Sequence, residues 1–556
     1  MAQTEADIVI VGGGLTGCAV ASRLKQADPS LSIILLEAGS DATGDPRTIS
    51  PMAGFALART EMDWQYVTQP QVHLNGRRLY GQAGKVLGGG STVNYGGWAR
   101  GDATDYDQWS RIVGDDRWSF QSLLPYFKKS ETFLVPKDAP IDKDLHGFLG
   151  PIKCTSVSNS NPERRYGLRQ PLFNAWSELG FSLNYDGNSG NIAGITEIVE
   201  NWHDGVRQPS HIAYQLDGVN VITSTMVQKV LFENSSVPIA SGVLTTKGKT
   251  IKAKKLVIVS TGAQRTPQLL MLSGIGPSSE LSQHGITTLV NNEEVGANYF
   301  DHFSLFQWWK LKKPEKVYAV GSPNWKNPAL FKGVPSDWTI KESVPAQILD
   351  EALKHDGVDE VDAAAYLAPG RSHLETTMIY LPGPAPAVGL NLPVDGTYVC
   401  TATMLNLPTS RGRVSLASHD PNDPPQLDPN FFATAVDRST LAYGAKRAAQ
   451  ALLETKVGQE YFEEEVTPPG TVSLGATSTK EDFEQRIKAV GMPFAHAAGT
   501  AAMGKVVDSK LNVLGVQRLK VVDYSILPTP ISSRPMATLY GIAEVAAEII
   551  LQELHA

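Results

Sequence analysis

The chain has 556 residues, of which 42% are hydrophobic and 19% charged, a composition typical of globular proteins that excludes a disordered chain. Its 49 basic and 57 acidic side chains give a net charge of −8, so neither nucleic acid nor an anionic membrane surface is expected as a partner. The three cysteines have no CxxC spacing, which excludes a disulfide framework. No signal peptide, membrane-spanning run or peroxisomal tripeptide is recognised, so we expect an intracellular, cytoplasmic protein.

The first forty residues predict a βαβ unit. Residues 7–11 form an apolar, β-branched run typical of a buried parallel strand, and residues 15–27 carry apolar side chains at helical spacing. Residues 32–36 form a second apolar strand, and Glu37 follows it. Glu37 would accept hydrogen bonds from an adenosine ribose, and its charge would repel a 2′-phosphate, so NADP is not expected.

The turn between this strand and helix has the sequence GGGLTG and fits the G-x-G-x-x-G dinucleotide fingerprint. Gly12 permits the tight turn, Gly14 lets the backbone approach a pyrophosphate, and Gly17 lets the helix pack closely. The amides of Leu15 and Thr16 would face the phosphates at the helix N-terminus. The fingerprint alone does not separate NAD from FAD.

Later parts of the chain add elements around a long variable middle. Apolar and β-branched runs predict strands at 251–260, 372–380, 397–407 and 517–523, and residues 536–554 predict a C-terminal helix. Residues 311–345 are rich in Lys and Pro, and we expect them to form a long, irregular surface segment.

Four motifs resemble the signatures of the glucose–methanol–choline (GMC) family of FAD oxidoreductases. Residues 81–101 (GQAGKVLGGGSTVNYGGWARG) are similar to the first signature, and residues 260–277 (STGAQRTPQLLMLSGIGP) to the second. Residues 295–302 resemble the family's V-G-x-N-x-x-D-H motif. The family's C-terminal block is matched by residues 494–504, 519–529 and 536–540.

The resemblance implies an α/β fold, α+β overall, with a Rossmann-like FAD-binding domain and a substrate domain built on an antiparallel sheet. On this basis we expect the FAD-binding domain at 1–145, 190–305 and 485–556, and the substrate domain at 146–189 and 306–484. The cofactor that the resemblance implies is FAD, and no metal is expected.

Positions carried over from the family motifs give a set of expected FAD contacts. For the ADP half they are Leu15, Thr16 and Glu37, with Val227 at the adenine edge. Near the flavin ring they are Ser91, Thr92 and Asn94, with Asp523 near the ribityl chain and pyrophosphate. Met536 opens a helix whose N-terminus would aim amides at the flavin, where negative charge grows on reduction.

His496 matches the first catalytic position of the family, where a neutral histidine accepts the substrate proton as hydride leaves for flavin N5. Most members have His or Asn at the second position, but here it is Arg534, which cannot act as a base. Arg534 could lower the pKa of His496, bind a carboxylate or stabilise superoxide, or it could form a structural ion pair. The His–Arg pair resembles the formate oxidase branch, although Ala495 stands where that branch has an aromatic residue.

The function implied by the resemblance is FAD-dependent oxidation of a small alcohol, aldehyde or formate-like carboxylate. Hydride would pass to flavin N5, and oxygen or another acceptor would reoxidise the flavin. The alternative is a lyase or cyclase of the same fold that keeps FAD without net redox chemistry. The expected partner is a small-molecule substrate, and the sequence leaves the oligomeric state open.

Overall fold

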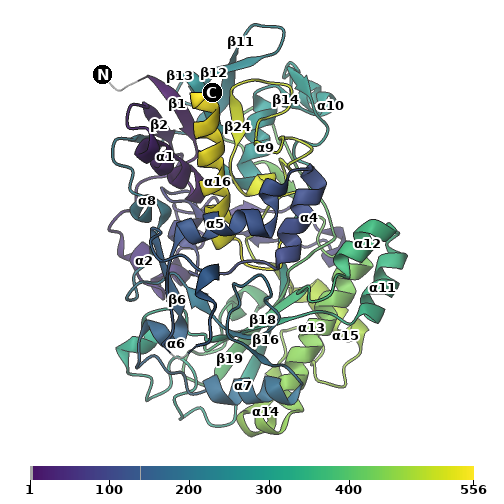
Figure 1. Cartoon of the computed structure of the whole chain (residues 1–556). Coiled ribbons are helices and arrows are strands. Elements are labelled where there is room, and N and C mark those ends of the chain that lie inside the picture. The colour runs from purple at the N-terminus through teal and green to yellow at the C-terminus, as the bar shows by residue number, and fades with distance from the viewer. Residues whose placement is uncertain (1–3, 138) are drawn as a thin grey trace.

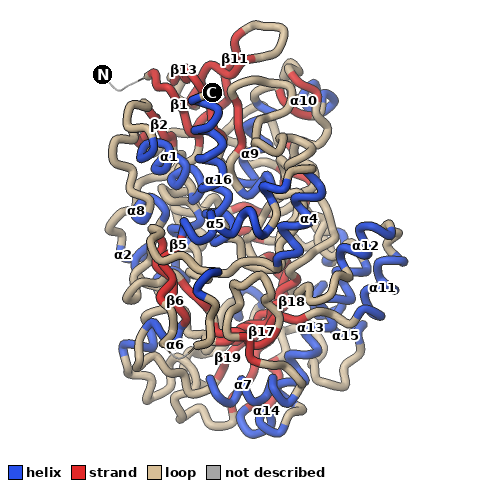
Figure 2. The backbone as a smooth tube through the Cα atoms, in the orientation of Figure 1, coloured by secondary structure: helices blue, strands red, loops and turns tan. Residues whose placement is uncertain are grey.

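The computed structural model describes residues 4–137 and 139–556, which form two large sheets with helices packed around them. One sheet lies at the top of Figure 1 and the other at the bottom, and the C-terminal helix α16 (Met536–His555) extends from the middle of the molecule up to the first sheet, where the chain ends. Much of the chain between the two sheets is loop (Figure 2). Within the described residues, the two large sheets are separate and share no strand.

The first sheet is mostly parallel and is built on the predicted βαβ unit. Its strands, in spatial order, are β10 (Asn220–Ile222), β2 (Ile33–Leu36), β1 (Glu5–Val11), β13 (Thr250–Val259), β12 (Ile239–Thr245) and β11 (Val227–Glu233), and β24 (Leu519–Val521) also pairs with β13. The apolar residues of β1 are buried because helices cover both faces of such a sheet. Helix α16 packs against both α1 (Leu15–Ala27) and α5 (Phe120–Ser130).

A buried carboxylate joins these three helices. Glu544 of α16 is fully buried and pairs with Arg23 of α1 at 2.7 Å and with Lys129 of α5 at 3.0 Å. These two ion pairs hold α16 against α1 and α5. The N-terminus of α16 lies toward the middle of the molecule (Figure 1).

The second sheet is mainly antiparallel. Its strands, in spatial order, are β22 (Phe462–Val466), β16 (Phe303–Leu311), β19 (Tyr398–Leu405), β18 (Leu374–Ile379), β17 (Trp338–Glu342), β8 (Gly194–Glu197) and β7 (Leu183–Asn184), and β23 (Met492–Pro493) also pairs with β16. Along β16, Phe303 and Leu305 join the core that contains helix α13 (Ala435–Leu453). Phe306 and Trp308 join a separate cluster on the opposite face, as strand alternation requires.

The fold class expected from the resemblance is confirmed: a Rossmann-like part with a mixed, mostly parallel sheet is joined to a part with an antiparallel sheet. The expectation for residues 311–345 is wrong in one respect, because the segment ends in β17, a buried strand between β18 and β8. Lys341 is buried there beside Glu375, and Glu342 is buried beside Arg447. These charged residues made the sequence of a central strand look like that of a surface segment.

The proposed domain boundaries stay a prediction. Strand β8 and the start of β16 pair in the second sheet, although both fall within 190–305. Among the described residues, no helix is both long and apolar enough to cross a membrane, and no cluster of side chains could hold a metal ion.

Candidate active site

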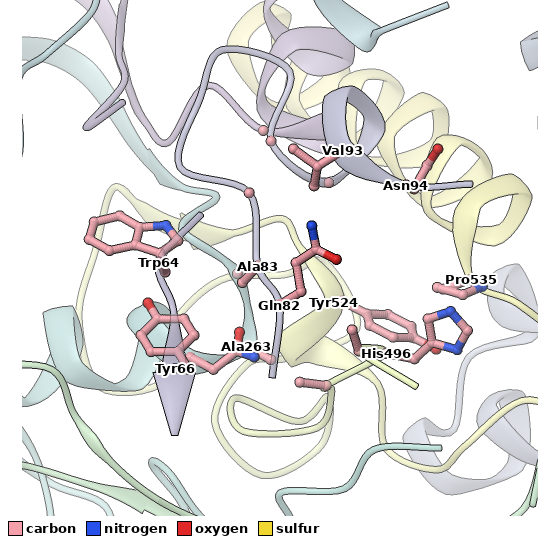
Figure 3. Close-up of a pocket in the computed structure, with 18 of the residues that line it drawn as sticks. Trp64, Tyr66, Gln82, Ala83, Val93, Asn94, Ala263, His496, Tyr524 and Pro535 are labelled. Carbon is pink, nitrogen blue, oxygen red and sulfur yellow. The ribbon is translucent and has the colours of Figure 1, made fainter. Parts of the chain in front are cut away.

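A cavity of about 1190 Å³ is lined by residues of both sheets. Ligand pockets commonly occupy roughly 300–1,000 Å³, so this cavity has room for a dinucleotide together with a substrate. Figure 3 shows His496 and Pro535 on one side of it and Trp64 and Tyr66 on the other. The cavity is therefore the candidate site for both cofactor and chemistry.

The turn between β1 and α1 has the close packing that the fingerprint requires. A Cβ atom on Gly17 would lie 2.0 Å from the carbonyl oxygen of Gly12, so a side chain there would force the helix away. The two carboxylate oxygens of Glu37 accept hydrogen bonds from the amides of Gly13 (2.8 Å) and Gly39 (2.7 Å). Burial raises the pKa of Glu37 to about 7, although these amides oppose the shift. Each oxygen keeps a lone pair that could accept from a ribose hydroxyl.

The glycine-rich segment packs directly against this turn. A Cβ atom on Gly89 would lie 2.8 Å from the Cα of Gly14, so the two glycine turns touch. Ser91 and Thr92 do not line the cavity, although both were expected near the flavin ring. The Ser91 hydroxyl donates to the Gly88 carbonyl at 2.6 Å, and the Thr92 hydroxyl donates to a backbone carbonyl at 2.8 Å. Both hydroxyls thus brace the segment from behind.

Asn94 and Met536 meet at the cavity wall, where the glycine-rich segment faces the start of α16. The Asn94 side-chain oxygen accepts from the amide of Gly96 and from the guanidinium of Arg207, both at 3.0 Å. Its nitrogen therefore points the other way, and it lies 3.2 Å from the Met536 sulfur. Arg207 also bonds the Asn94 carbonyl, so one buried cation fixes this amide.

Asp523 links the last strand of the first sheet to helix α9 (Gly262–Leu272). One carboxylate oxygen accepts from the Gly262 amide (2.9 Å) and the Thr266 hydroxyl (2.6 Å), and the other accepts from the Ser525 amide (2.8 Å). Asp523 lines the cavity, so this bonding holds the carboxylate at the wall.

The wall also suits a polar ligand. Among the described residues, neither the Gln82 amide nitrogen nor the Tyr524 hydroxyl has a hydrogen-bond partner, and both atoms are buried. Such groups need partners, and the polar edges of FAD can supply them. The expected cofactor residues that line the cavity are Gly12, Gly14, Leu15, Thr16, Glu37, Asn94, Val227, Asp523 and Met536. Those that lie behind the wall are Gly17, Ser91 and Thr92.

His496 lines the cavity, and a second histidine that the sequence analysis did not single out holds it. The Nδ1 atoms of His302 and His496 lie 2.9 Å apart, and His302 Nε2 lies 3.1 Å from the Ile531 carbonyl. A carbonyl only accepts, so His302 carries its proton on Nε2 and accepts at Nδ1. His496 must then donate from Nδ1, which leaves the lone pair of a neutral ring on Nε2.

Burial keeps both rings neutral. It lowers the pKa of His302 to about 4. It also lowers the pKa of His496 well below the ordinary value of 6.5, and the neighbouring His302 and the charge of Arg534 act in the same direction. The lowering of the His496 pKa by Arg534 was one of the alternatives raised from the sequence. The site therefore presents a neutral imidazole, with its lone pair on Nε2, at neutral pH.

The backbone around His496 is held in an uncommon conformation. Ala495 has a backbone φ of +60°, in the left-handed region that residues other than glycine rarely adopt. The Asp301 carboxylate accepts from the His496 amide at 2.7 Å, immediately beside His302 in the chain. Asp301 and His302 thus fix the His496 backbone and ring together. Ala495 lets the chain turn between Phe494 and the imidazole.

Arg534 lines the same cavity, but its charge is already paired. Its Nε lies 2.9 Å and its Nη2 lies 2.7 Å from Oε1 of Glu375, and Nη2 also donates to the Thr377 hydroxyl at 3.0 Å. The structural ion pair raised as an alternative from the sequence is therefore present. It does not remove Arg534 from the cavity wall, where the side chain remains 20% exposed.

Sequence reasoning missed His302 and Glu375 as functional neighbours. His302 lies in the V-G-x-N-x-x-D-H motif, and that position was a signal for a role near the flavin. Glu375 lies in a predicted strand, and no pattern marks it. One hint was available in the sequence of this strand, LETTMI, where Glu375 stands among apolar and hydroxyl side chains. A buried acid of this kind needs a cation nearby.

Comparison with known proteins agrees with this geometry. Residues 6–304 and 408–543 match the two family models described as GMC oxidoreductase. The GMC-type oxidoreductase acuG of Aspergillus aculeatus is 38% identical over 547 residues, covering 98% of this chain and 99% of that protein. An alcohol dehydrogenase [acceptor] of Pseudomonas putida is 31% identical over 571 residues, covering 99% and 96%.

Among solved structures, a formate oxidase of Aspergillus oryzae, studied for FAD modification, superposes with a TM-score of 0.88 at 26% identity. The match covers 100% of this chain and 99% of that chain. The similarity thus extends over both sheets and over the cavity between them.

Replacement of Glu37 with alanine should weaken FAD binding. The Gly13 and Gly39 amides and the ribose hydroxyl would all lose the carboxylate that accepts their hydrogen bonds. Hydrogen bonds to a charged group correspond to about tenfold to hundredfold in affinity. The ratio of flavin absorbance to protein absorbance after purification and dilution measures how much FAD the protein retains. Asp41→Ala, which removes a nearby exposed carboxylate outside the cavity, is the control. Equal flavin retention in both variants would show that Glu37 does not hold the cofactor.

Proposed function

The chain belongs to the GMC oxidoreductase family, and we propose that it oxidises a small alcohol, with His496 accepting the hydroxyl proton while hydride leaves the carbinol carbon. It is an FAD-dependent oxidoreductase, as its family is. FAD supplies the hydride acceptor when bound. The substrate class and the role of each residue are the proposal.

The hydrogen bond between His302 and His496 carries this proposal. It directs the His496 proton to Nδ1 and leaves Nε2 as the basic atom. Among the hydrogen bonds of the described residues, none uses Nε2 of His496, so this atom is available to a substrate hydroxyl. A neutral imidazole at this place can accept a proton at neutral pH without first losing one.

The wall around His496 suits a small organic substrate. The side chains of Phe306, Ile379, Met492 and Phe494 line this part of the cavity and are apolar. They would exclude water from the carbon that loses hydride. Thr377 and Arg534 supply polar atoms beside them, and these could hold the substrate oxygen.

Oxidation of formate is the second candidate. Its support is the presence of His496 and Arg534 in one cavity, together with the similarity to a formate oxidase over the whole chain. Formate has no hydroxyl proton at neutral pH, so in this case Arg534 would hold the carboxylate while hydride leaves. The chain would then use His496 mainly as a hydrogen-bonding group.

Anaerobic mixing of the FAD-loaded protein with a panel of alcohols, aldehydes and formate separates these functions. The proposal predicts loss of the oxidised flavin spectrum with one or more alcohols, and peroxide formation on admitting air would identify oxygen as the acceptor. Bleaching by formate alone would support the second candidate. Turnover of a substrate without bleaching would contradict both and support a lyase.

Replacement of His496 with alanine should slow flavin reduction by the best alcohol by about 10²–10⁴-fold, because the general base is lost. The FAD spectrum should remain, since His496 is distant in the chain from the dinucleotide turn and contributes no bond to it. Stopped-flow reduction measures the rate. His419→Ala, which removes an exposed histidine outside the cavity, should behave like the parent. An unchanged reduction rate in the His496 variant would refute its role as the base.

The pH dependence follows from the lowered pKa of His496. A histidine whose pKa is lowered stays neutral as the pH falls, so the base remains available below 6.5. The kcat/KM for the alcohol should therefore stay level as the pH falls through 6.5, where an ordinary histidine would be half protonated. A profile that halves near 6.5 and recovers above it would contradict the neutral, buried state of His496.

A further inference from the structure

We propose that Glu375 determines the charge selectivity of the active site: by neutralising Arg534 from within the protein, it makes the cavity select neutral over anionic substrates. The inference rests on the proposed function for its substrate chemistry and deepens it, since it favours an alcohol over formate. Glu375 would be a specificity-determining residue that acts through Arg534.

The pair places the negative charge of Glu375 directly against the guanidinium of Arg534. Both Nε and Nη2 of Arg534 lie within 3 Å of the same Glu375 oxygen, Oε1, and Nη2 also donates to Thr377. Glu375 is 3% exposed, so little water screens the pair. A substrate carboxylate that approached Arg534 would meet the negative charge of Glu375 across the guanidinium.

A second cation secures Glu375 from behind. Lys341 of β17 lies with Nζ 3.8 Å from Oε2 of Glu375, too far for a direct hydrogen bond, and its side chain is 2% exposed. Among the described residues, Nζ of Lys341 has no hydrogen-bond partner. A cavity of about 30 Å³ is lined by Lys341, Glu375 and Arg534, which is room for one water molecule. A water there could accept from Lys341 and donate to Oε2.

This arrangement explains why Glu375 must be charged. A buried ammonium and a partly buried guanidinium both pair with Glu375, and an unpaired buried charge is costly. Burial acts to raise the pKa of Glu375, but the Coulomb attraction of Arg534, together with that of Lys341, outweighs it and lowers the pKa. The carboxylate thus stays negative, and its field extends to the part of the cavity where the substrate would bind.

Most of the wall beside the pair is apolar, and Arg534 is the side chain of this wall that carries a positive charge. Of the side chains around His496 and Arg534, Phe306, Ile379 and Phe494 are apolar. Glu200 also lines the cavity, but it adds negative charge and is paired with Arg164. An anionic substrate would therefore have to compete with Glu375 for Arg534, whereas a neutral hydroxyl would only need a hydrogen bond.

The test measures binding of formate and acetate to the FAD-loaded protein, with the perturbation of the flavin spectrum as readout and no turnover required. Glu375→Gln keeps the shape and one acceptor oxygen but removes the charge, so both anions should bind at least about tenfold more tightly. Thr377→Val is the matched control: it removes the other partner of Arg534 without changing charge, and affinity for the anions should not rise.

The single Glu375 variant leaves Lys341 buried without the carboxylate that pairs with it at 3.8 Å, and a loss of folding would be visible by circular dichroism. The double variant Lys341→Met/Glu375→Gln removes both charges together and leaves Arg534 uncompensated. It should show the same tightening for formate and acetate. Either folded variant therefore answers the question.

Two results would overturn the proposal: formate and acetate binding as in the parent when Glu375 is neutralised in a folded protein, or an equal increase in Thr377→Val. Neither result touches the proposed alcohol oxidation, because binding is measured without chemistry. Conversely, if no alcohol bleaches the flavin, the proposed function is refuted. The anion titration still tests the charge selectivity on its own.

Discussion

The chemistry of this site depends on a chain of two hydrogen bonds that ends at a backbone carbonyl. Ile531 accepts from His302, and His302 accepts from His496. Because a carbonyl cannot donate, the direction of both bonds is fixed, and the free lone pair falls on the atom of His496 that can face a substrate. Burial keeps the two rings neutral, so the same packing that fixes the tautomer also fixes the charge.

The carbonyl at the end of this chain belongs to a loop that is itself tightly held. Ser532, next to Ile531, donates from its amide and its hydroxyl to Asp105, at 2.7 and 2.6 Å. Asp105 pairs with Arg371, which lies three residues before the first residue of β18, the strand that carries Glu375. The loop that presents Arg534 is thus tied to the helix of Asp105 and to the second sheet. Tautomer, guanidinium and substrate wall are therefore positioned by one connected set of buried polar contacts.

The parts of the fold that could be predicted from the sequence are those coded by neighbouring residues. The strand at 7–11, the helix at 15–27 and the C-terminal helix from 536 agree with the structure to within a few residues, because apolar runs and periodicity are local. Strand β17 was missed because some of its buried positions hold charged side chains, such as Lys341, which pairs with Glu375.

Residues named by a motif, such as His496 and Arg534, could be placed at the cavity from the sequence, and their contact partners could not. His496 and Arg534 follow from their motifs. The partners do not, because His302 lies 194 residues from His496 and Glu375 lies 159 residues from Arg534. Ser91 and Thr92 illustrate the converse: their motif placed them near the flavin, but their hydroxyls are used by the backbone behind the wall.

The most direct test of this account is the single-turnover rate of flavin reduction by the best alcohol in two variants of His302. Glutamine can accept from His496 and donate to Ile531 as the imidazole does, whereas leucine can do neither. The account predicts that His302→Leu retains FAD but reduces it about 10²-fold more slowly, with much of the rate recovered in His302→Gln. Equal rates in His302→Leu and the parent would contradict the claim that this hydrogen-bond chain prepares His496 as the base.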